Sequence, residues 1–243
     1  MSNDCFEIYV ARHGQSYGNL RRRQGIDSSV LAIPEREDPA LTDAGKQQAH
    51  LLGELLKNIK FDAIYSSPLL RAAGTAYEVL LSQQEKSDID TIYLLDELIE
   101  VNVLEGYLGR GLDFLKEQFP KANFVHEQSP EHPVPRKGEG DDMRVSVHRA
   151  KCAIDFIRSK YTYGQKVFIA THGTYLTSFM YAALGISPET SRFRFGCENS
   201  SFNRIMYYTD GKILLEAAND ISHLRLWGDD LIPQARSLFI QNE

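Results

Sequence analysis

Short apolar runs rich in Ile, Val, Phe and Tyr alternate along this chain with longer segments in which apolar residues recur every three or four positions. The short runs are typical of buried strands, and the longer spacing is typical of helices that bury one face. Strands that alternate with helices predict an α/β fold with a mostly parallel sheet. The length of 243 residues favours a single domain over residues 1–243, with an insertion or lid at about residues 97–142.

Turn and cap residues set the limits of the expected elements. Thr42 is a helix cap ahead of a segment with one apolar face, and Ser67-Pro68 suits the start of the next helix. Residues 14–39 are polar, residues 128–142 are rich in Pro, Gly and charge, and we expect loops at both places. Strands are expected at residues 7–11, 61–65, 91–95, 166–170, 202–208 and 213–218. A hairpin turn at Asp210-Gly211 joins the last two strands. Helices are expected at residues 42–59, from residue 67 onward, at 142–161 and at 174–184.

Two of the expected strands end in nearly the same residues. The run EIYVARHG at residues 7–14 recurs as KVFIATHG at residues 166–173. Each copy is a buried strand followed by a polar residue, a histidine and a glycine. Because ligands bind at the carboxyl ends of parallel strands, we expect His13 and His172 to meet at one edge of the sheet. The repeat therefore predicts a paired-histidine active site.

Composition narrows the class of protein. Hydrophobic residues make up 42% of the chain and charged residues 25%, as in an ordinary globular protein. The net charge of -6 argues against nucleic acid as a partner. The three scattered cysteines fit reduced thiols, and no apolar run is long enough for a membrane span. With no secretory signal at the N-terminus, we expect a cytoplasmic protein without membrane partners.

The residues around the first histidine suit phosphate chemistry. A histidine with an ordinary pKa of about 6.5 has a neutral nitrogen near pH 7, so His13 beside Arg12 can act as a nucleophile. Arg71 falls in the first turn of the helix that Ser67-Pro68 begins, where a cation opposes the helix dipole unless an anion binds there. Taken singly, each residue also has a purely structural explanation: His13 can be a hydrogen-bonded core histidine, and Arg71 can be a solvent-facing arginine. Together with His172 they describe a pocket for a tetrahedral anion.

Several ordered segments extend this pattern over most of the chain. They are Arg12-His13-Gly14-Gln15-Ser16 with Asn19, the run LTDAGKQQA at residues 41–49, the run SSPLLRA at 66–72 with Thr75-Ala76, Gly138-Glu139-Gly140, Arg149, His172-Gly173, Asn199 and the run NDISHL at 219–224. In this set the chain resembles the histidine phosphatase superfamily, which includes the cofactor-dependent phosphoglycerate mutases.

The resemblance implies a three-layer α/β/α sandwich like that of the phosphoglycerate mutases and a phosphohistidine mechanism. It makes His13 the nucleophile that attacks phosphorus, and His172 a second catalytic histidine that binds the phosphoryl group. The cationic side chains supply the charge stabilisation, so neither a metal ion nor another cofactor is expected. The phosphate-binding positions that it implies are Arg12, Ser16, Asn19, Arg71 and Gly173.

The family also uses a carboxyl group that protonates the leaving oxygen and later activates water. Glu100 follows an apolar pair as the family's glutamate does, and we assign the role to it. The pattern departs here, because Leu104 stands where the family's glycine is expected. Glu105, four residues before Gly109, and Glu97 are the alternatives.

The leading functional hypothesis is a phosphatase that hydrolyses a small phosphorylated metabolite. A phosphoglycerate mutase is the alternative, although Tyr17-Gly18 precedes Asn19 where mutases have a tryptophan, and residues 22–27 lack their Phe-Thr-Gly-Trp pattern. A non-catalytic phospholigand-binding protein is a third possibility. Arg21-Arg22-Arg23 fits either contact with a second anionic group of the substrate or a solvated loop. The sequence fixes neither the substrate nor the oligomeric state.

Overall fold

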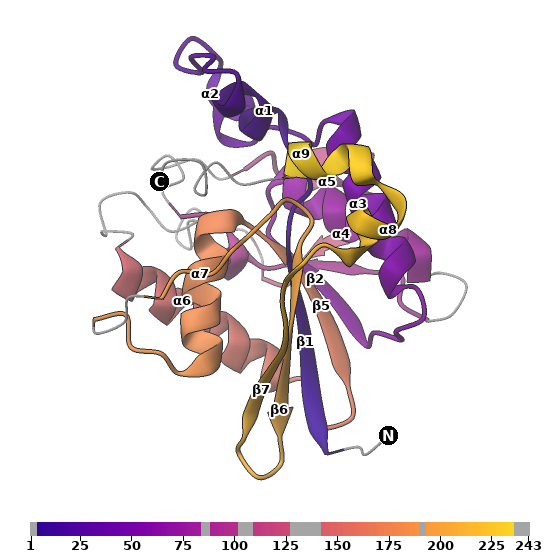
Figure 1. Ribbon diagram of the computed structural model, residues 1–243, viewed down its shortest axis with the longest axis vertical. Coiled ribbons are helices and arrows are strands. Elements are labelled where there is room, and N and C mark those ends of the chain that lie inside the picture. The colour runs from indigo at the N-terminus through magenta and orange to yellow at the C-terminus, as the bar shows by residue number, and fades with distance from the viewer. Residues whose placement is uncertain (1–3, 84–87, 102–108, 127–141, 190–192, 236–243) are drawn as a thin grey trace.

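The computed structural model describes residues 4–83, 88–101, 109–126, 142–189 and 193–235. Within these ranges the chain forms a seven-stranded sheet with helices packed on both faces (Figure 1). The strands are β1 (Cys5–Arg12), β2 (Ala63–Ser66), β3 (Ile92–Leu94), β4 (Ala122–Phe124), β5 (Lys166–Thr171), β6 (Phe202–Tyr208) and β7 (Ile213–Asp220).

The sheet has the order β4-β3-β2-β5-β1-β6-β7. The first five strands in this order are mutually parallel, and β6 and β7 complete the sheet in antiparallel fashion. The turn between β6 and β7 contains Gly211 at φ 84°, a backbone conformation that favours glycine. The prediction of an α/β fold with a mostly parallel sheet is confirmed.

Two groups of helices cover the faces of this sheet. Helices α6 and α7 pack on one face, and α3, α4 and α5 on the other, which gives three layers (Figure 1). The helices are α1 (Tyr17–Arg23), α2 (Ile33–Glu37), α3 (Asp43–Leu56), α4 (Leu70–Gln83), α5 (Leu112–Gln118), α6 (Met143–Arg158), α7 (Gly173–Leu184), α8 (Ser222–Trp227) and α9 (Ile232–Ala235).

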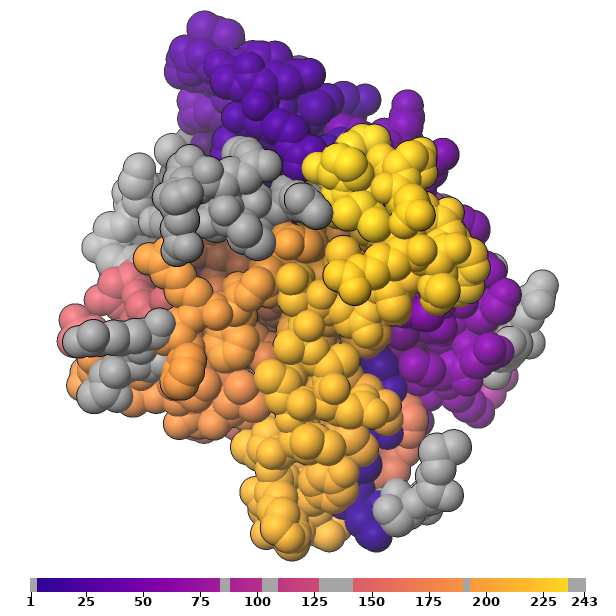
Figure 2. All heavy atoms as spheres, in the orientation of Figure 1, coloured from indigo at the N-terminus to yellow at the C-terminus, as the bar shows by residue number. Residues whose placement is uncertain are grey.

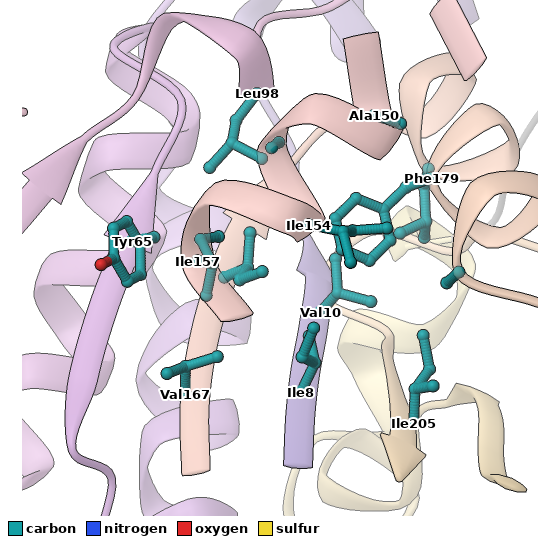
Figure 3. Packing of buried hydrophobic residues seen from close by; sticks show 14 of the residues in the cluster. Ile8, Val10, Tyr65, Leu98, Ala150, Ile154, Ile157, Val167, Phe179 and Ile205 are labelled. Atoms are coloured by element: carbon teal, nitrogen blue, oxygen red, sulfur yellow. The ribbon is translucent and has the colours of Figure 1, made fainter. Parts of the chain in front are cut away.

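Alternation along β1 builds both halves of the core. Ile8 and Val10 point toward α6 and α7, where Ile154 and Phe179 meet them (Figure 3). Tyr9 and Ala11, which alternate with them along the strand, face the opposite layer. Each fully buried aliphatic side chain contributes about 1.5–3 kcal/mol, so this central strand is held firmly from both sides. Its carboxyl end is therefore a rigid support for the residues that follow.

The segment from Gly14 to Pro39 is not the plain loop that its polarity predicts. It contains α1 and α2, which form a lobe that projects from the rest of the molecule (Figures 1 and 2). Helix α1 begins with a capping box, in which Ser16 and Asn19 exchange hydrogen bonds. Neither helix has a buried residue. Because neither helix buries an apolar face, the sequence lacks the apolar periodicity that would predict them.

Two further differences concern element limits. The fourth helix begins at Leu70 rather than at Ser67-Pro68, because the Leu70 N–H is bound by the carboxylate of Asp38 at 2.7 Å. Helix α5 and strand β4 lie within the expected 97–142 insertion and extend the sheet at one edge. Most of the expected 128–142 lid, namely residues 128–141, lies outside the described residues. Among the described helices, none has the length and apolarity that crossing a membrane requires.

Candidate active site

The two histidines meet where β1 and β5 end side by side. Arg12 is paired with Thr171 in the parallel register, and the His13 N–H donates to the Thr171 carbonyl at 2.9 Å. The next residue on each strand is thus a histidine at the same sheet edge. The ring centroids of His13 and His172 lie 5.2 Å apart, with the rings inclined by 60°. The predicted meeting of the two histidines is confirmed.

Hydrogen bonding fixes which nitrogen of His13 is free. Its Nδ1 lies 2.6 Å from the Gly14 carbonyl oxygen. A carbonyl can only accept, so Nδ1 carries the proton and Nε2 of the neutral ring keeps its lone pair. Burial lowers the pKa of His13 well below its usual value, and the charges of Arg71 and Arg12 act in the same direction. The ring is therefore neutral near pH 7, with Nε2 available as a nucleophile.

Arg12 is held against a glycine. Its Nη1 donates to the Cys197 carbonyl at 2.6 Å, while its Nε is buried without a hydrogen-bond partner among the described residues. A Cβ on Gly173 would lie 3.1 Å from that Nε and 3.3 Å from Cζ. A side chain at position 173 would crowd the guanidinium group, so a glycine there leaves room for Arg12 in this position. A buried N–H without a partner is costly, which indicates that a ligand completes its hydrogen bonding.

Arg71 is buried in the first turn of α4, as predicted. Its Nη1 donates to the Glu37 carbonyl at 3.2 Å and lies 4.0 Å from Oδ1 of Asp38. Burial lowers the pKa of this arginine, while the carboxylates of Asp38 and Glu100 oppose that change. The last residue of α2 and the residue after it, Glu37 and Asp38, therefore hold the guanidinium group in position, and Asp38 helps to keep it charged.

His172 caps the start of α7 and is fully buried. Its Nε2 lies 2.7 Å from the Ser67 hydroxyl, and its Nδ1 has no hydrogen-bond partner among the described residues. Burial lowers the pKa of His172 well below its usual value, with Arg71 and His13 adding to the effect. The ring is thus neutral and has one nitrogen to offer a ligand.

Ser16 and Asn19 anchor the start of α1 beside the histidines. The Asn19 side-chain oxygen accepts from the Ser16 N–H at 3.0 Å and from the Asn199 amide at 3.1 Å. The same Asn199 amide donates to the His13 carbonyl at 3.0 Å. This network ties the first turn of α1 to the backbone of His13, so both predicted residues belong to the site.

Of the candidates for the proton donor that the structure describes, Glu100 is the one that lines the pocket. Its carboxylate accepts the Tyr175 N–H at 2.8 Å and the Thr174 N–H at 3.3 Å, at the N-terminus of α7. Arg149 donates to the carbonyl of Ile99, the preceding residue, at 2.6 Å. The alternative Glu97 is not among the described residues that line the pocket. Glu105 lies outside the described residues.

These groups surround a pocket of about 120 Å³. Four arginines against two glutamates give its walls an excess of positive charge, on a chain whose net charge is -6. Such a pocket concentrates anions. The lining residues are Arg12, His13, Ser16, Gly18, Asn19, Arg22, Arg36, Glu37, Pro39, Arg71, Glu100, Gly173 and Thr174. All predicted site residues are in this set except His172, whose ring is fully buried and packs against that of His13.

Sequence reasoning missed the contribution of the segment after α1. Arg36, Glu37 and Pro39 line the pocket, and Asp38 lies behind it against Arg71. No motif marks these positions, because the chain returns to the site only through the folding of α1 and α2. Within the described ranges, no group of three His, Cys, Asp or Glu side chains is placed to hold a metal ion.

Comparison with known proteins shows the family to which the chain belongs. The family model of the histidine phosphatase superfamily, branch 1, matches residues 8–220. Phosphoserine phosphatase 1 of Hydrogenobacter thermophilus is 28% identical over 90% of this chain and 94% of its own length. A probable phosphoglycerate mutase of Proteus mirabilis is 26% identical over 90% of this chain and 94% of its own.

A solved structure agrees with these relatives. The crystal structure of phosphoglycerate mutase from Bacillus anthracis superposes with a TM-score of 0.61 at 25% identity, covering 91% of this chain and 96% of that one. The fold is therefore shared over nearly the whole length, and the family model spans most of the chain. The chain belongs to the histidine phosphatase superfamily, branch 1.

Proposed function

We propose that this protein is a phosphatase that hydrolyses small phosphate monoesters through a phosphohistidine at His13. The observation that carries the proposal is the hydrogen bond from Nδ1 of His13 to the Gly14 carbonyl, which leaves Nε2 unprotonated in a pocket lined by arginines. A neutral imidazole nitrogen beside two buried guanidinium groups suits attack on a phosphate ester.

In the first step, the lone pair of His13 Nε2 forms a bond to phosphorus as the bond from phosphorus to the ester oxygen breaks. The leaving oxygen takes a proton from the Glu100 carboxyl group and departs as an alcohol. Arg12 and Arg71 stabilise the charge on the transferring phosphoryl oxygens, and the free Nδ1 of His172 is a further contact for them. Ser16, Asn19 and Gly173 shape the rest of the phosphate site.

In the second step, water attacks the phosphorus of the phosphohistidine. The Glu100 carboxylate accepts a proton from that water, and the bond between nitrogen and phosphorus breaks. Inorganic phosphate leaves, and His13 and the Glu100 carboxyl group return to their starting states. The net reaction consumes one ester and one water and yields one alcohol and one phosphate.

A rapid-quench experiment tests the mechanism. We expect a protein-bound phosphoryl group that is labile to acid and stable to base when the enzyme is mixed with labelled substrate. The His13→Ala variant should lack the adduct and lose at least about a thousandfold in kcat, because it has no nucleophile. Unchanged hydrolysis in His13→Ala without any trapped adduct would overturn the mechanism.

The mutase alternative shares the first step and differs in the acceptor of the phosphoryl group. Incubation with 3-phosphoglycerate in the presence of 2,3-bisphosphoglycerate separates the two reactions. We expect release of inorganic phosphate to exceed isomerisation. Rapid isomerisation with negligible release of phosphate would make the protein a mutase.

The proposed partner is a small phosphorylated metabolite, and the names of the relatives support that class. A cytoplasmic location is part of the same proposal. It is supported by Cys5, Cys152 and Cys197, which are all free thiols in the structure.

A further inference from the structure

The backbone just before Glu100 is held by an arginine that belongs to another layer of the fold. Arg149 is buried and lies in α6. Its Nη1 donates to the Glu97 carbonyl at 3.1 Å and to the Ile99 carbonyl at 2.6 Å. One guanidinium group thus binds the chain at two carbonyls, and the second of them belongs to the residue next to Glu100.

The carbonyl between these two is held from a different direction. Leu98 is fully buried, and its carbonyl accepts from the Thr171 hydroxyl at 2.7 Å. Thr171 is the last residue of β5 and directly precedes His172. Because a carbonyl oxygen moves together with its planar peptide unit, three successive bonds restrict the whole segment. The approach of the chain to Glu100 is therefore set by α6 and β5 together.

The same guanidinium group also lies against the residue that binds the Glu100 carboxylate. Cζ of Arg149 is 4.5 Å from the centre of the Tyr175 ring, and Tyr175 is fully buried in the first turn of α7. A guanidinium group is attracted to the face of an aromatic ring. The Tyr175 N–H in turn donates to Oε1 of Glu100 at 2.8 Å. Arg149 therefore contacts both the backbone that leads into Glu100 and the residue that fixes its carboxylate.

These contacts give the arginine a role at a distance from the substrate. Arg149 is not among the described residues that line the pocket. Burying a guanidinium group costs free energy, and an uncharged side chain of similar length fills an interior position without that cost. The contribution of Arg149 therefore lies in the groups that its N–H donors and its stacked face hold in place.

We propose that Arg149 is a positioning residue for Glu100, which it holds through the preceding backbone and through Tyr175 so that the carboxyl group faces the leaving oxygen of the ester. This inference rests on the proposed phosphatase function. A displacement of about 1 Å can cost about 100-fold in rate when proton transfer depends on the position of the group. Arg149 thus acts on protonation of the leaving group and not on binding of the phosphate.

The leaving group of the substrate separates this role from a structural one. We expect Arg149→Met to lower kcat/KM about tenfold or more for alkyl phosphates, and less than about threefold for p-nitrophenyl phosphate, whose leaving group needs little protonation. Inhibition by inorganic phosphate should stay within about twofold of the wild type. Arg149→Lys keeps the charge but not the planar fork, so its leaving-group dependence should be intermediate, and it replaces Arg149→Met if that variant does not fold.

Arg158→Met is the matched control. Arg158 lies about 14 Å further along α6, and its Cζ is 4.3 Å from the centre of the Tyr207 ring. Its loss removes a stacked guanidinium group that has no contact with Glu100, so the leaving-group dependence should match that of the wild type.

A double-mutant cycle gives the sharper comparison. In the Glu100→Gln background, Arg149→Met should lower kcat/KM for alkyl phosphates by less than about twofold, because the group that it positions no longer donates a proton. Equal losses in the two backgrounds, or a leaving-group dependence in Arg149→Met and Arg149→Lys equal to that of the wild type, would overturn the proposal.

Hydrogen exchange tests the positioning role without turnover. The Tyr175 N–H is bonded to Glu100, and we expect its protection factor to fall about tenfold or more in Arg149→Met. Arg158→Met should leave it unchanged, and amides in the centre of β1 report any general loss of stability. A loss of protection at Tyr175 without a loss in β1 supports the proposal even if the wild type forms no phosphohistidine. Unchanged protection at Tyr175 contradicts it even if p-nitrophenyl phosphate is hydrolysed.

Discussion

At the scale of single residues, the surroundings of His13 keep its nucleophilic nitrogen unprotonated, a task that a general base performs in other nucleophilic sites. The Gly14 carbonyl holds the proton on Nδ1, and burial with two nearby guanidinium groups lowers the pKa of the ring. These features keep Nε2 unprotonated without a second side chain to remove a proton. What the site still requires is a group that protonates the leaving oxygen.

That requirement yields a prediction for Glu100. Glu100→Gln keeps an oxygen that can accept the Tyr175 N–H but removes the acidic proton. We expect kcat for alkyl phosphates to fall about 100-fold, because general acid catalysis contributes about 10²–10⁴. Aryl phosphates with good leaving groups should fall far less. Plotting kcat/KM against the pKa of the leaving alcohol should give a steeper dependence for the variant than for the wild type.

The competing carboxylates serve as matched controls. Glu97→Gln should leave the leaving-group dependence unchanged, because the structure places Glu97 outside the pocket wall. Glu105→Gln tests the remaining alternative directly. Full activity in Glu100→Gln together with a loss in Glu105→Gln would transfer the role to Glu105.

At the scale of elements, the projecting lobe of α1 and α2 is joined to the phosphate site by its last residues. Asp38 is fully buried, and its Oδ1 accepts the Leu70 N–H at the start of α4. The same oxygen lies 4.0 Å from Arg71, and the neighbouring Glu37 carbonyl accepts from that arginine. The lobe thus determines where α4 begins and where the Arg71 guanidinium lies.

Asp38 is therefore a positioning residue for Arg71. Asp38→Asn keeps an oxygen for the Leu70 N–H but removes the charge near the guanidinium. We expect kcat/KM for p-nitrophenyl phosphate to fall about tenfold, equivalent to about 1.4 kcal/mol of transition-state stabilisation. Competitive inhibition by inorganic phosphate should weaken in parallel, which a loss of stability alone would not cause.

Asp38→Ala should also lose about 1–2 kcal/mol in free energy of unfolding, because it leaves a helix N-terminal N–H without its acceptor. Urea denaturation measures this loss. Asp43→Asn is the control, since the Asp43 side chain is 95% exposed in the first turn of α3. An Asp38→Asn enzyme with wild-type kcat/KM and wild-type phosphate inhibition would contradict the positioning role.

The same elements show what sequence patterns could predict. The strands that carry His13 and His172 are continuous apolar runs, and a parallel sheet places their ends together, so both histidines were predictable. Arg71 was predictable from its place in the first helical turn. Asp38 and Arg36 were not, because they reach the site through short helices without buried residues. Leu70 and Arg71, the partners of Asp38, are more than 30 residues away in sequence, and no local periodicity encodes such contacts.

At the scale of the whole molecule, the site is supported by segments from the opposite end of the chain. The His13 carbonyl accepts from the Ser200 N–H at 3.1 Å. Ser200 has φ 58°, an uncommon conformation for a residue other than glycine, and its hydroxyl lies 2.7 Å from Nε2 of His223. His223 is fully buried at the start of α8. It therefore connects the C-terminal helices to the backbone of the proposed nucleophile.

This arrangement makes stability depend on pH in a defined direction. Burial lowers the pKa of His223 from 6.5 to about 4. The unfolded chain therefore binds a proton at this position below about pH 6.5, whereas the folded protein resists binding it until about pH 4. Stability contributed by the neutral ring is complete above pH 6.5 and is lost as the pH falls. Between pH 7.5 and pH 5 this one group should cost about 2 kcal/mol.

Urea unfolding of the wild type and of His223→Gln at these two pH values isolates the effect. We expect the variant to lose about 2 kcal/mol less than the wild type between pH 7.5 and pH 5, whatever its stability at pH 7.5, since glutamine does not titrate. His148→Gln, at an exposed position of α6, should reproduce the wild-type difference. Equal losses in the wild type and His223→Gln would mean that His223 is protonated in the folded protein, so that its contact with Ser200 would have to survive the charge.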